Sequence, residues 1–409
     1  MIEISDTDMA EGTDMAEGTN ITDGPGGFEF NSYPQRVLVA GILLIVFITG
    51  TIGNSLTILA VLLTRKLQNA TNTFVINLAV SDLLACLFIP WSFAGLLNRR
   101  EWPENLAFAC SVAGGVLTVS VGCSFYTLAS IALNRLVLIT CSKHTYHTVF
   151  SAPALILWVL VIWAIPFCVV ILPPIFGIGA LGYNPKYKTC SDISVGYHDN
   201  ASQSYDYIQA AGVFPVPLIV LLVSYCKILH YVWSHSRKFV TREVPMSHGV
   251  EKHIPMGETT VTSSSIDSEV PVKPSRPARV SVNMSVESLN KLADSSPGGT
   301  TLKRITRMSR REMQVTKNLF ILFCAFMLCL LPYVICLVID DTDPATPYAV
   351  GILLVNSCLN PIIYAVRFPN FKMVFKSILK CQWYSIPEPS WLLRELKCGQ
   401  CGCCSPQYI

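Results

Sequence analysis

The sequence predicts an all-α membrane protein: a seven-transmembrane helix bundle with a short amphipathic membrane-surface helix after the seventh span. Two observations support this class. The 409 residues are 51% hydrophobic and only 14% charged, with a mean hydropathy of +0.47, which is typical of a polytopic membrane protein. The apolar residues also gather into seven segments, each near the ~20 residues that a spanning helix needs.

The predicted spans cover residues 37–63, 74–97, 107–134, 153–174, 208–233, 315–339 and 347–366. The third span begins near Cys110 and contains no charged side chain before Arg135. When the N-terminus is placed outside, most lysines and arginines near the span ends fall inside, as the positive-inside rule requires. The sequence therefore predicts a multi-pass plasma-membrane protein with an extracellular N-terminus and a cytoplasmic C-terminus.

Two predicted segments lie outside the spans and lack a helical or strand period. Residues 1–36 are acidic and poor in apolar side chains, so we expect a disordered extracellular tail. Residues 234–314 lie between the first five predicted spans (37–233) and the last two (315–366). They are rich in Ser, Thr, Val and Pro and predict a long disordered cytoplasmic loop. Asn20 and Asn200 head glycosylation sequons on the predicted external side.

The chain after the seventh span predicts attachment to the inner leaflet. Residues 367–381 carry aromatic side chains on one helical face and lysines at every fourth position on another, as in an amphipathic interfacial helix. Cys381 ends this helix and is a candidate palmitoylation site. Residues 382–409 form a cysteine-rich cytoplasmic tail, whose thiols suit further lipidation or a thiolate zinc site. Of the sixteen cysteines, only Cys110 and Cys190 fall in external segments, where an oxidising milieu lets them pair.

Asp82 is the only acid well inside a predicted span. A carboxylate in the bilayer is costly and marks a functional site. Polar side chains are expected at a similar depth: Asn54, Ser124, Asn356, Ser357 and Asn360. These oxygen donors suit an allosteric sodium ion at Asp82, and the alternative is interhelical hydrogen bonding alone. We expect no other metal or cofactor.

Motifs in all seven spans carry a family resemblance. They are Gly53-Asn54, Leu78-Ala79-Val80-Ser81-Asp82, Cys110 twenty-five residues before Arg135, Trp158, Pro217, Tyr225, Phe326, Pro332, and Asn360-Pro361-Ile362-Ile363-Tyr364. Together they resemble the rhodopsin-like (class A) G-protein-coupled receptors. Asn134-Arg135 in place of the commoner Asp-Arg, and Thr189-Cys190-Ser191, look like the moody and trapped-in-endoderm group of invertebrate receptors, and more distantly like melatonin receptors.

The resemblance implies a receptor rather than an enzyme, with a heterotrimeric G protein, arrestin and a receptor kinase as partners and no nucleic acid. Activation would move the sixth helix outward through a set of switch residues: Asn134, Arg135, Tyr225, Glu312, Phe326, Pro332, Pro361 and Tyr364. The prolines remove backbone hydrogen bonds and kink their helices. We expect Arg135 to pair with Glu312 at rest, and the alternative is that Glu312 only balances Arg310 and Arg311.

By the same resemblance, eight side chains line an external ligand cavity: Leu117, Thr118, Val121, Gln209, Leu330, Tyr333, Val350 and Leu354. None is charged, which favours a lipophilic small molecule. Leu117 and Leu354 stand where amine receptors and opsins carry their aspartate and retinal lysine, so neither ligand class is expected. The acidic rim of Asp192, Asp340, Asp341 and Asp343 supports an alternative, a cationic peptide.

Two other protein classes compete with a receptor. A secondary transporter also has many spans and a buried carboxylate, but it usually carries an internal repeat and broken helices, which this sequence does not show. An intramembrane enzyme needs a nucleophile with a base, or a metal-ligand cluster, inside the spans. The single histidine within a predicted span, His230, lies near its inner end.

Overall fold

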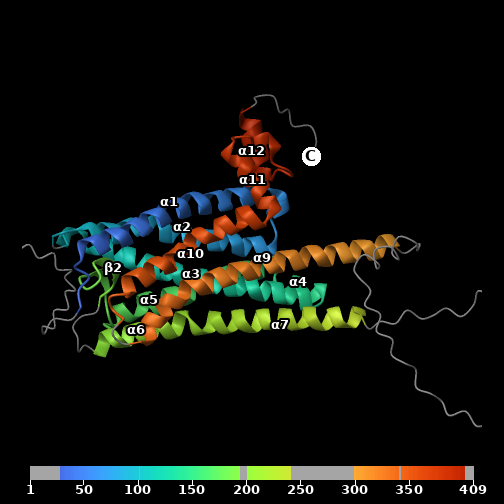
Figure 1. The fold of residues 1–409 in the computed structure, drawn as a ribbon. Coiled ribbons are helices and arrows are strands. Elements are labelled where there is room, and N and C mark those ends of the chain that lie inside the picture. Colours follow the sequence, from blue (N-terminus) through green and yellow to red (C-terminus); the bar gives the residue numbers. More distant parts are fainter. Residues whose placement is uncertain (1–27, 101, 194–199, 241–298, 340–341, 401–409) are drawn as a thin grey trace, which may run out of the picture.

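The computed structural model describes residues 28–100, 102–193, 200–240, 299–339 and 342–400, with side chains described for all of these except 200–203, 232–240, 299–313 and 396–400. Within these residues, seven helical stretches are long and apolar enough to cross a membrane. They run side by side as one bundle (Figure 1). We call the two ends of the bundle the hairpin end and the α11 end, after the elements found there.

The spanning helices are α1 (Tyr33–Leu63), α2 (Ala70–Leu97), α3 (Ala107–Thr140), α5 (Ala152–Ile175), α6 (Asn200–Val213) with α7 (Pro215–Val240), α9 (Gly299–Val338) and α10 (Thr346–Arg367). The fifth span is thus two helices that meet at Phe214, because Pro215 and Pro217 have no N–H to continue the first helix. Each predicted span overlaps one of these stretches.

Helix α3 lies at the centre of the bundle and contacts α2, α5, α7, α9 and the hairpin. Two glycines permit this close packing. A Cβ added at Gly122 would lie 2.8 Å from Cβ of Pro166 on α5, and one at Gly114 would lie 3.1 Å from the backbone of Ser191. Small residues let neighbouring backbones approach in membrane helices.

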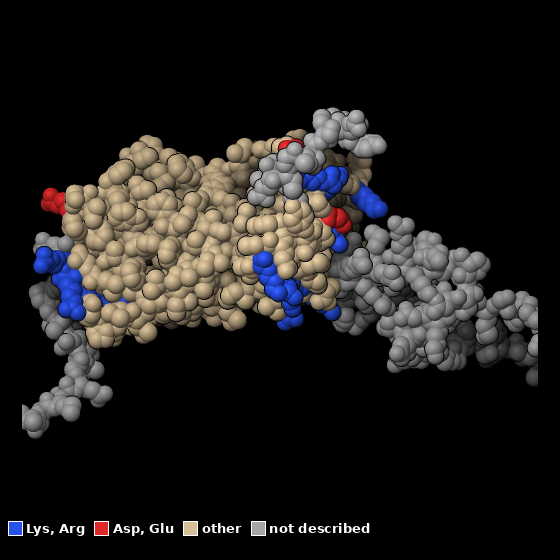
Figure 2. Space-filling view, turned by 90° about the horizontal axis from the view of Figure 1, so that it is seen from above, with Lys and Arg blue, Asp and Glu red and all other residues tan. Residues whose placement is uncertain are grey.

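The outer surface of the bundle is apolar along its middle. Figure 2 shows a wide uncharged belt, with the lysines, arginines and acids confined to the two ends. Large side chains such as Ile156, Leu160 and Leu328 are more than half exposed on this belt. Such exposure would be unfavourable in water and is what a helix bundle presents to hydrocarbon.

At the hairpin end, strands β1 (Leu181–Asn184) and β2 (Thr189–Asp192) pair antiparallel, with Tyr183 opposite Cys190. A disulfide joins Cys190 to Cys110 in the first turn of α3, with the two Cα atoms 5.1 Å apart. The short helix η2 (Glu104–Leu106) precedes α3 on this side. The hairpin is therefore tied covalently to the central helix.

At the α11 end, η1 (Arg65–Leu67) joins α1 to α2, and α4 (Lys143–Val149) follows α3. Helix α11 (Pro369–Leu379), η3 (Trp383–Ser385) and α12 (Trp391–Gln400) complete the described chain. Figure 1 shows α11 and α12 projecting sideways from the bundle at the level of the last turns of α1. Helix α11 is the predicted amphipathic helix.

Several predicted boundaries differ from the structure. Helix α1 starts at Tyr33, inside the predicted tail, because Pro34 suits the first helical turn. Helices α7 and α9 extend into the predicted loop 234–314, as far as Val240 and from Gly299. The available signal for the helix before span six is that Leu302, Ile305 and Met308 recur at helical spacing without a proline. The predicted tail 382–409 includes α12, which sequence reasoning missed.

Candidate functional site

Three segments that are far apart in the sequence meet over the hairpin end of the bundle. We call residues 28–32, 181–193 and 342–345 together the hairpin lid. The backbone N–H of Phe30 donates a hydrogen bond to the carbonyl of Lys186 at 2.8 Å. The Phe30 ring is 1% exposed and packs edge-on against Tyr348 of α10, with the ring centres 5.8 Å apart. The segment before α1 is thus part of the lid.

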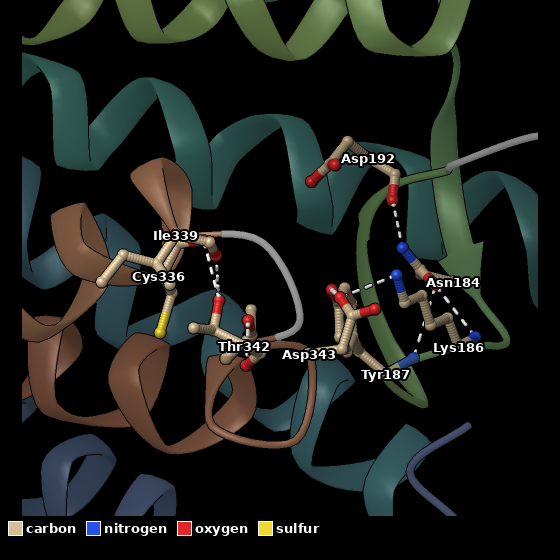
Figure 3. Close-up of polar contacts among 9 residues, drawn as sticks. Asn184, Lys186, Tyr187, Asp192, Cys336, Ile339, Thr342 and Asp343 are labelled. Atoms are coloured by element: carbon tan, nitrogen blue, oxygen red, sulfur yellow. Dashed lines mark hydrogen bonds and ion pairs between the residues drawn. The ribbon is translucent and has the colours of Figure 1, made fainter. Parts of the chain in front are cut away.

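Asp343 joins the hairpin to the connection between α9 and α10. Its carboxylate accepts the Lys186 ammonium at 2.8 Å and the Tyr187 hydroxyl at 2.7 Å, and Figure 3 shows both side chains converging on it. Burial, and next the hydrogen bond to Asp343, raise the pKa of Tyr187, so the hydroxyl keeps its proton and stays a donor. This contact fixes the lid across the mouth of the bundle.

The side chain of Asn184 holds the hairpin turn in place. Its carbonyl oxygen accepts from the N–H of Lys186 at 3.0 Å, and its amide donates to the carbonyl of Asp192 at 2.7 Å. Asn184 is 1% exposed. A buried Asn with these partners pre-orders the turn that presents Lys186 and Tyr187 to Asp343.

The predicted acidic rim is only partly free to attract a cation. Asp343 is neutralised by Lys186, and Glu29 forms a looser ion pair with Lys188 at 3.4 Å. Burial raises the pKa of the Asp192 carboxyl, although a hydrogen bond with the Asp206 side chain favours its charged form. Asp340 and Asp341 lie outside the described residues.

The residues predicted to line the ligand cavity lie below the lid in two groups. Leu117, Val121, Val350 and Leu354 belong to one apolar cluster of α1, α2, α3 and α10. Leu330 and Tyr333 of α9 belong to the neighbouring cluster around Phe125 and Phe214. Thr118 donates to the carbonyl of Gly114 in its own helix at 3.0 Å, and Gln209 is half-buried on α6. The lining is apolar, with few polar groups.

A small cavity lies next to this second group, at the level of the helix break at Phe214. Its volume is about 10 Å³, and it is lined by Phe125, Phe214, Pro217, Leu218, Leu221, Phe326 and Leu330. A ligand pocket for a small molecule occupies roughly 300–1,000 Å³. This cavity is therefore a packing gap around Phe326, whose ring lies edge-on to Phe125 at 4.7 Å.

Asp82 lies in the middle of the bundle and is 1% exposed. Its carboxylate accepts hydrogen bonds from Asn360 at 2.6 Å, Ser124 at 2.9 Å and Ser357 at 3.1 Å. Helices α2, α3 and α10 thus meet at one acid, and we call this group the polar core. A buried carboxylate with three donors is well solvated by the protein, which offsets much of its desolvation cost.

Asn54 joins the polar core through the backbone of α10. Its amide donates to the carbonyl of Ser357 at 2.8 Å and to Gly50 at 3.0 Å. Among the described residues, the Asn54 carbonyl oxygen and the Ser120 hydroxyl are buried without a hydrogen-bond partner. Asn356 is buried beside Ser357. Buried oxygens without a hydrogen-bond partner are what a cation or an ordered water would satisfy.

Asn134 holds three elements together at the α11 end, a role that sequence reasoning did not find. Its carbonyl oxygen accepts from the Thr71 hydroxyl of α2 at 2.7 Å, and its amide donates to the Tyr146 hydroxyl of α4 at 3.3 Å. Asn134 is fully buried. Arg135 is the next residue of α3. The Glu312 side chain lies outside the described residues, so pairing between Arg135 and Glu312 stays a prediction.

Two further predicted switch residues lie in aromatic contacts near the α11 end. Tyr225 of α7 stacks on Phe323 of α9, with centroids 5.1 Å apart. Tyr364 of α10 stacks on Phe371 of α11 at 5.3 Å. Pro361 packs so close to α1 that a Cβ at Gly53 would lie 2.7 Å from its Cβ. Each of these predicted switch residues therefore contacts a neighbouring helix.

Two further polar links were missed from the sequence. Asn77 of α2 donates to Thr127 of α3 at 2.7 Å and accepts from the Trp163 indole of α5 at 2.9 Å. Asn318 of α9 donates to the carbonyl of Arg367 of α10 at 2.8 Å. The available signal was the same as for Asp82, an amide within an apolar span.

Comparison with known proteins agrees with this arrangement. The family model described as "7 transmembrane receptor (rhodopsin family)" matches residues 53–364, from the glycine against Pro361 to the tyrosine stacked on Phe371. The chain belongs to this rhodopsin family. The family is described as one of transmembrane receptors, which agrees with the prediction of a receptor rather than an enzyme.

Named relatives follow the predicted resemblance. The chain is 26% identical to the G-protein coupled receptor moody of Drosophila pseudoobscura pseudoobscura over 86% of this chain and 53% of the relative. It is 25% identical to protein trapped in endoderm-1 of Drosophila melanogaster over 87% of this chain and 81% of the relative. The chain thus spans about half the length of the moody receptor. Squid rhodopsin shares the fold, with a TM-score of 0.61 at 21% identity, covering 85% of this chain and 87% of squid rhodopsin.

Proposed function

We propose that this rhodopsin-family receptor lies in the plasma membrane with its hairpin end outside the cell and transmits a ligand signal to a heterotrimeric G protein. The polar core carries this proposal. One buried carboxylate joins α2, α3 and α10 between the apolar ligand lining and the α11 end. A change at the lining can alter this shared hydrogen-bond group and so reach the cytoplasmic face.

The ligand we favour is a lipophilic small molecule. The lining below the lid is apolar, and Asp343 of the lid is already paired with Lys186. A cationic peptide remains the second candidate, because Asp192 lies at the mouth without a lysine or arginine among its described hydrogen-bond partners. Fractionated extracts distinguish the two, since stimulation by an organic-phase fraction supports the lipophilic ligand and stimulation by a protease-sensitive fraction supports the peptide.

Activation, in this proposal, swings the α11 end of α9 outward and opens a groove for the C-terminal helix of a Gα subunit. Pro332 supplies the bend inside α9. Arg135 restrains the resting state through Glu312 and then helps to bind Gα. Arrestin and a receptor kinase would use the same face.

A sodium ion fits the polar core. Asp82, Ser124 and Ser357 would hold it, with the unpartnered carbonyl oxygen of Asn54 as a further ligand. Oxygen ligands around one carboxylate are the chemistry that a hard cation prefers. When bound, the ion would neutralise Asp82 and hold α2, α3 and α10 in one packing.

Covalent modification completes the proposal. Asn20 and Asn200 are proposed glycosylation sites, and their side chains lie outside those described. Cys381 follows α11 with an exposed thiol and is the proposed palmitoylation site. An acyl chain there would add a second membrane signal to the basic helix.

The test is nucleotide exchange on purified receptor in lipid nanodiscs with a panel of Gα subunits. We expect receptor-dependent exchange on at least one subunit, increased by an active extract fraction. Exchange no faster than with an empty nanodisc, for every subunit and fraction, would contradict the G-protein proposal. Sodium-coupled solute uptake into vesicles containing the chain would instead support the transporter alternative.

A further inference from the structure

The chain folds back after α11 and docks on the end of α1. The backbone N–H of Ser390 donates to the carbonyl of Leu63, and the N–H of Arg65 donates to the carbonyl of Glu388, both at 2.9 Å. Thr64 and Pro389 form an antiparallel bridge between these bonds. Helix α12 therefore begins directly beside the last turn of α1. We call residues 369–395 the α11–α12 platform.

The apolar face of α11 is covered by protein. Phe371, Val374 and Ile378 are each 8% exposed or less, and they share one core cluster with Ile386 and Leu393 of the returning chain. The sequence predicted that this aromatic face would lie on the inner leaflet. Because the returning chain and the bundle cover these side chains, any apolar contact between the platform and the membrane must come from its exposed side chains, which on α11 are Met373 and Leu379.

Trp391 and Leu392 provide such a contact. Trp391 is 74% exposed and Leu392 is 40% exposed, and both follow the residue that is bonded to Leu63. On α1, the preceding Leu62 and Leu59 are also exposed, so the lipid-facing surface of α1 continues onto the start of α12. Figure 1 places the platform level with the last turns of α1, where a bilayer ends. Tryptophan is enriched at this depth.

The platform is also basic. Exposed cations on it and on the adjoining η1 are Arg65, Lys66, Lys372, Lys376, Lys380 and Arg394, whereas the exposed acids described there are Glu388 and Glu395. The three lysines of α11 and the turn after it are spaced four residues apart and so follow one helical stripe. A basic surface next to an apolar contact matches a leaflet that carries anionic headgroups.

We propose that the α11–α12 platform binds the surface of a leaflet that contains anionic phospholipid. Trp391 and Leu392 insert at the headgroup boundary, and the cations pair with lipid phosphates and carboxylates. Helix α12, which docks on the end of α1, would thereby help to set the depth of the receptor in the bilayer. The inference rests on the proposed orientation only for naming the inner leaflet, and a nanodisc with identical leaflets tests it in either orientation.

Hydrogen exchange of the full chain in nanodiscs tests the proposal. Peptides that cover residues 386–395 are compared in phosphatidylcholine alone and in phosphatidylcholine mixed with phosphatidylserine. We expect exchange to slow several-fold in the anionic lipid and to return toward the neutral-lipid rate at high salt, because exposed charges are screened. Peptides from the middle of α2 should exchange equally in both lipids and report that the bundle stays folded.

Variants on α12 identify the contacts. Arg394→Gln should reduce the lipid-dependent protection, and its neighbour Glu395→Gln is the matched control that should not. Trp391→Ser combined with Leu392→Ser should reduce protection in both lipids without altering the α2 peptides, because both side chains point out of the core. Equal exchange in neutral and anionic lipid, or protection that requires added G protein, would overturn the proposal in favour of internal packing or a protein partner.

Discussion

Asn134 shows at the scale of one residue how an uncharged side chain can join three elements. Its carbonyl oxygen accepts from Thr71, 63 residues earlier, and its amide donates to Tyr146, 12 residues later. The sequence indicated only that Asn134 cannot ionise. Its partners could not be predicted, because they depend on where α2 and α4 pack against α3.

Asn134→Leu should destabilise the receptor. The substitution leaves the Thr71 hydroxyl, which is 4% exposed, without its acceptor, at a cost of about 1–3 kcal/mol. Thermal unfolding in detergent measures the effect. Tyr146→Phe is the matched control, because it removes only the longer bond of 3.3 Å and should cost less. An Asn134→Leu variant as stable as the wild type would contradict this role.

Asp82→Asn should remove sodium-dependent stabilisation. The wild-type unfolding temperature is expected to rise with sodium chloride and not with choline chloride, since an ion that binds only the folded state stabilises it by mass action. The variant loses the carboxylate and should respond equally to both salts. The variant also replaces one carboxylate oxygen, an acceptor, by an amide group that donates. The hydrogen bond from Asn360 is weakened, so a lower unfolding temperature is expected in both salts. A sodium response that persists in Asp82→Asn would show that the ion binds elsewhere.

The polar core was predictable at this scale, whereas the link from Asn54 was only partly so. Asp82, Ser124 and Asn360 stand out because each is polar within an apolar span at similar depth. That Asn54 reaches the backbone of Ser357 rather than Asp82 depends on how α1 is turned about its axis. Helical periodicity in an all-apolar span is too weak to fix that rotation.

At the scale of elements, the hairpin lid depends on Asp343. Asp343→Asn removes an ion pair whose side chains are 28% and 30% exposed and weakens the bond from Tyr187, a combined loss of about 1–2 kcal/mol. Such a loss favours opening of the lid roughly 5- to 30-fold. A cysteine introduced at Thr118, below the lid, should then react faster with a hydrophilic methanethiosulfonate reagent than it does with the lid intact.

The matched control for the lid is Glu29→Gln. Its partner Lys188 lies at 3.4 Å, and the Glu29 side chain is 52% exposed, so labelling of the cysteine at position 118 should change little. The same receptors without the introduced cysteine give the background from native thiols. Equal labelling rates with and without Asp343→Asn would show that the ion pair does not hold the lid.

Helix α12 could not be predicted from the sequence, unlike the seven spans and α11. The seven spans follow from length and hydropathy, and the period of α11 follows from its lysines. Residues 391–400 form a helix too short to be stable alone in water. Pro387 and Pro389 just before it indicate irregular chain. Docking on α1 provides the stabilisation, and a contact between residues 63 and 390 has no local signal.

At the scale of the whole molecule, the two ends of the bundle are held differently. The hairpin end is closed by a disulfide and an ion pair among three chain segments. At the α11 end, the Asn318 side chain of α9 donates a hydrogen bond to the carbonyl of Arg367 of α10. Among the described residues, the covalent link between elements therefore lies at the end where the ligand is proposed to enter.

Glu312→Gln should raise ligand-independent nucleotide exchange. A charge pair with Arg135 at a partly hydrated membrane edge contributes up to about 1 kcal/mol, which changes a two-state population several-fold. Arg135→Ala should lower exchange while surface expression is kept. Arg310→Gln is the control, because it alters the local charge of α9 without removing the acid. Basal exchange of Glu312→Gln at the wild-type level would show that this pair does not restrain the receptor.

Because α9 is long, a small change in its bend at Pro332 produces a large displacement at its Gly299 end. Gly299 lies 33 positions before Pro332 in α9, roughly 50 Å at the usual rise, so a change of about 10° in the bend moves the far end by about 9 Å. The Asn318 bond acts only about 21 Å from the same pivot. A force at the tip therefore acts with about 2.4 times the leverage of that bond. In the proposed outward swing, a partner that binds the outermost turns of α9 would therefore act on a longer arm than the Asn318 bond that opposes it.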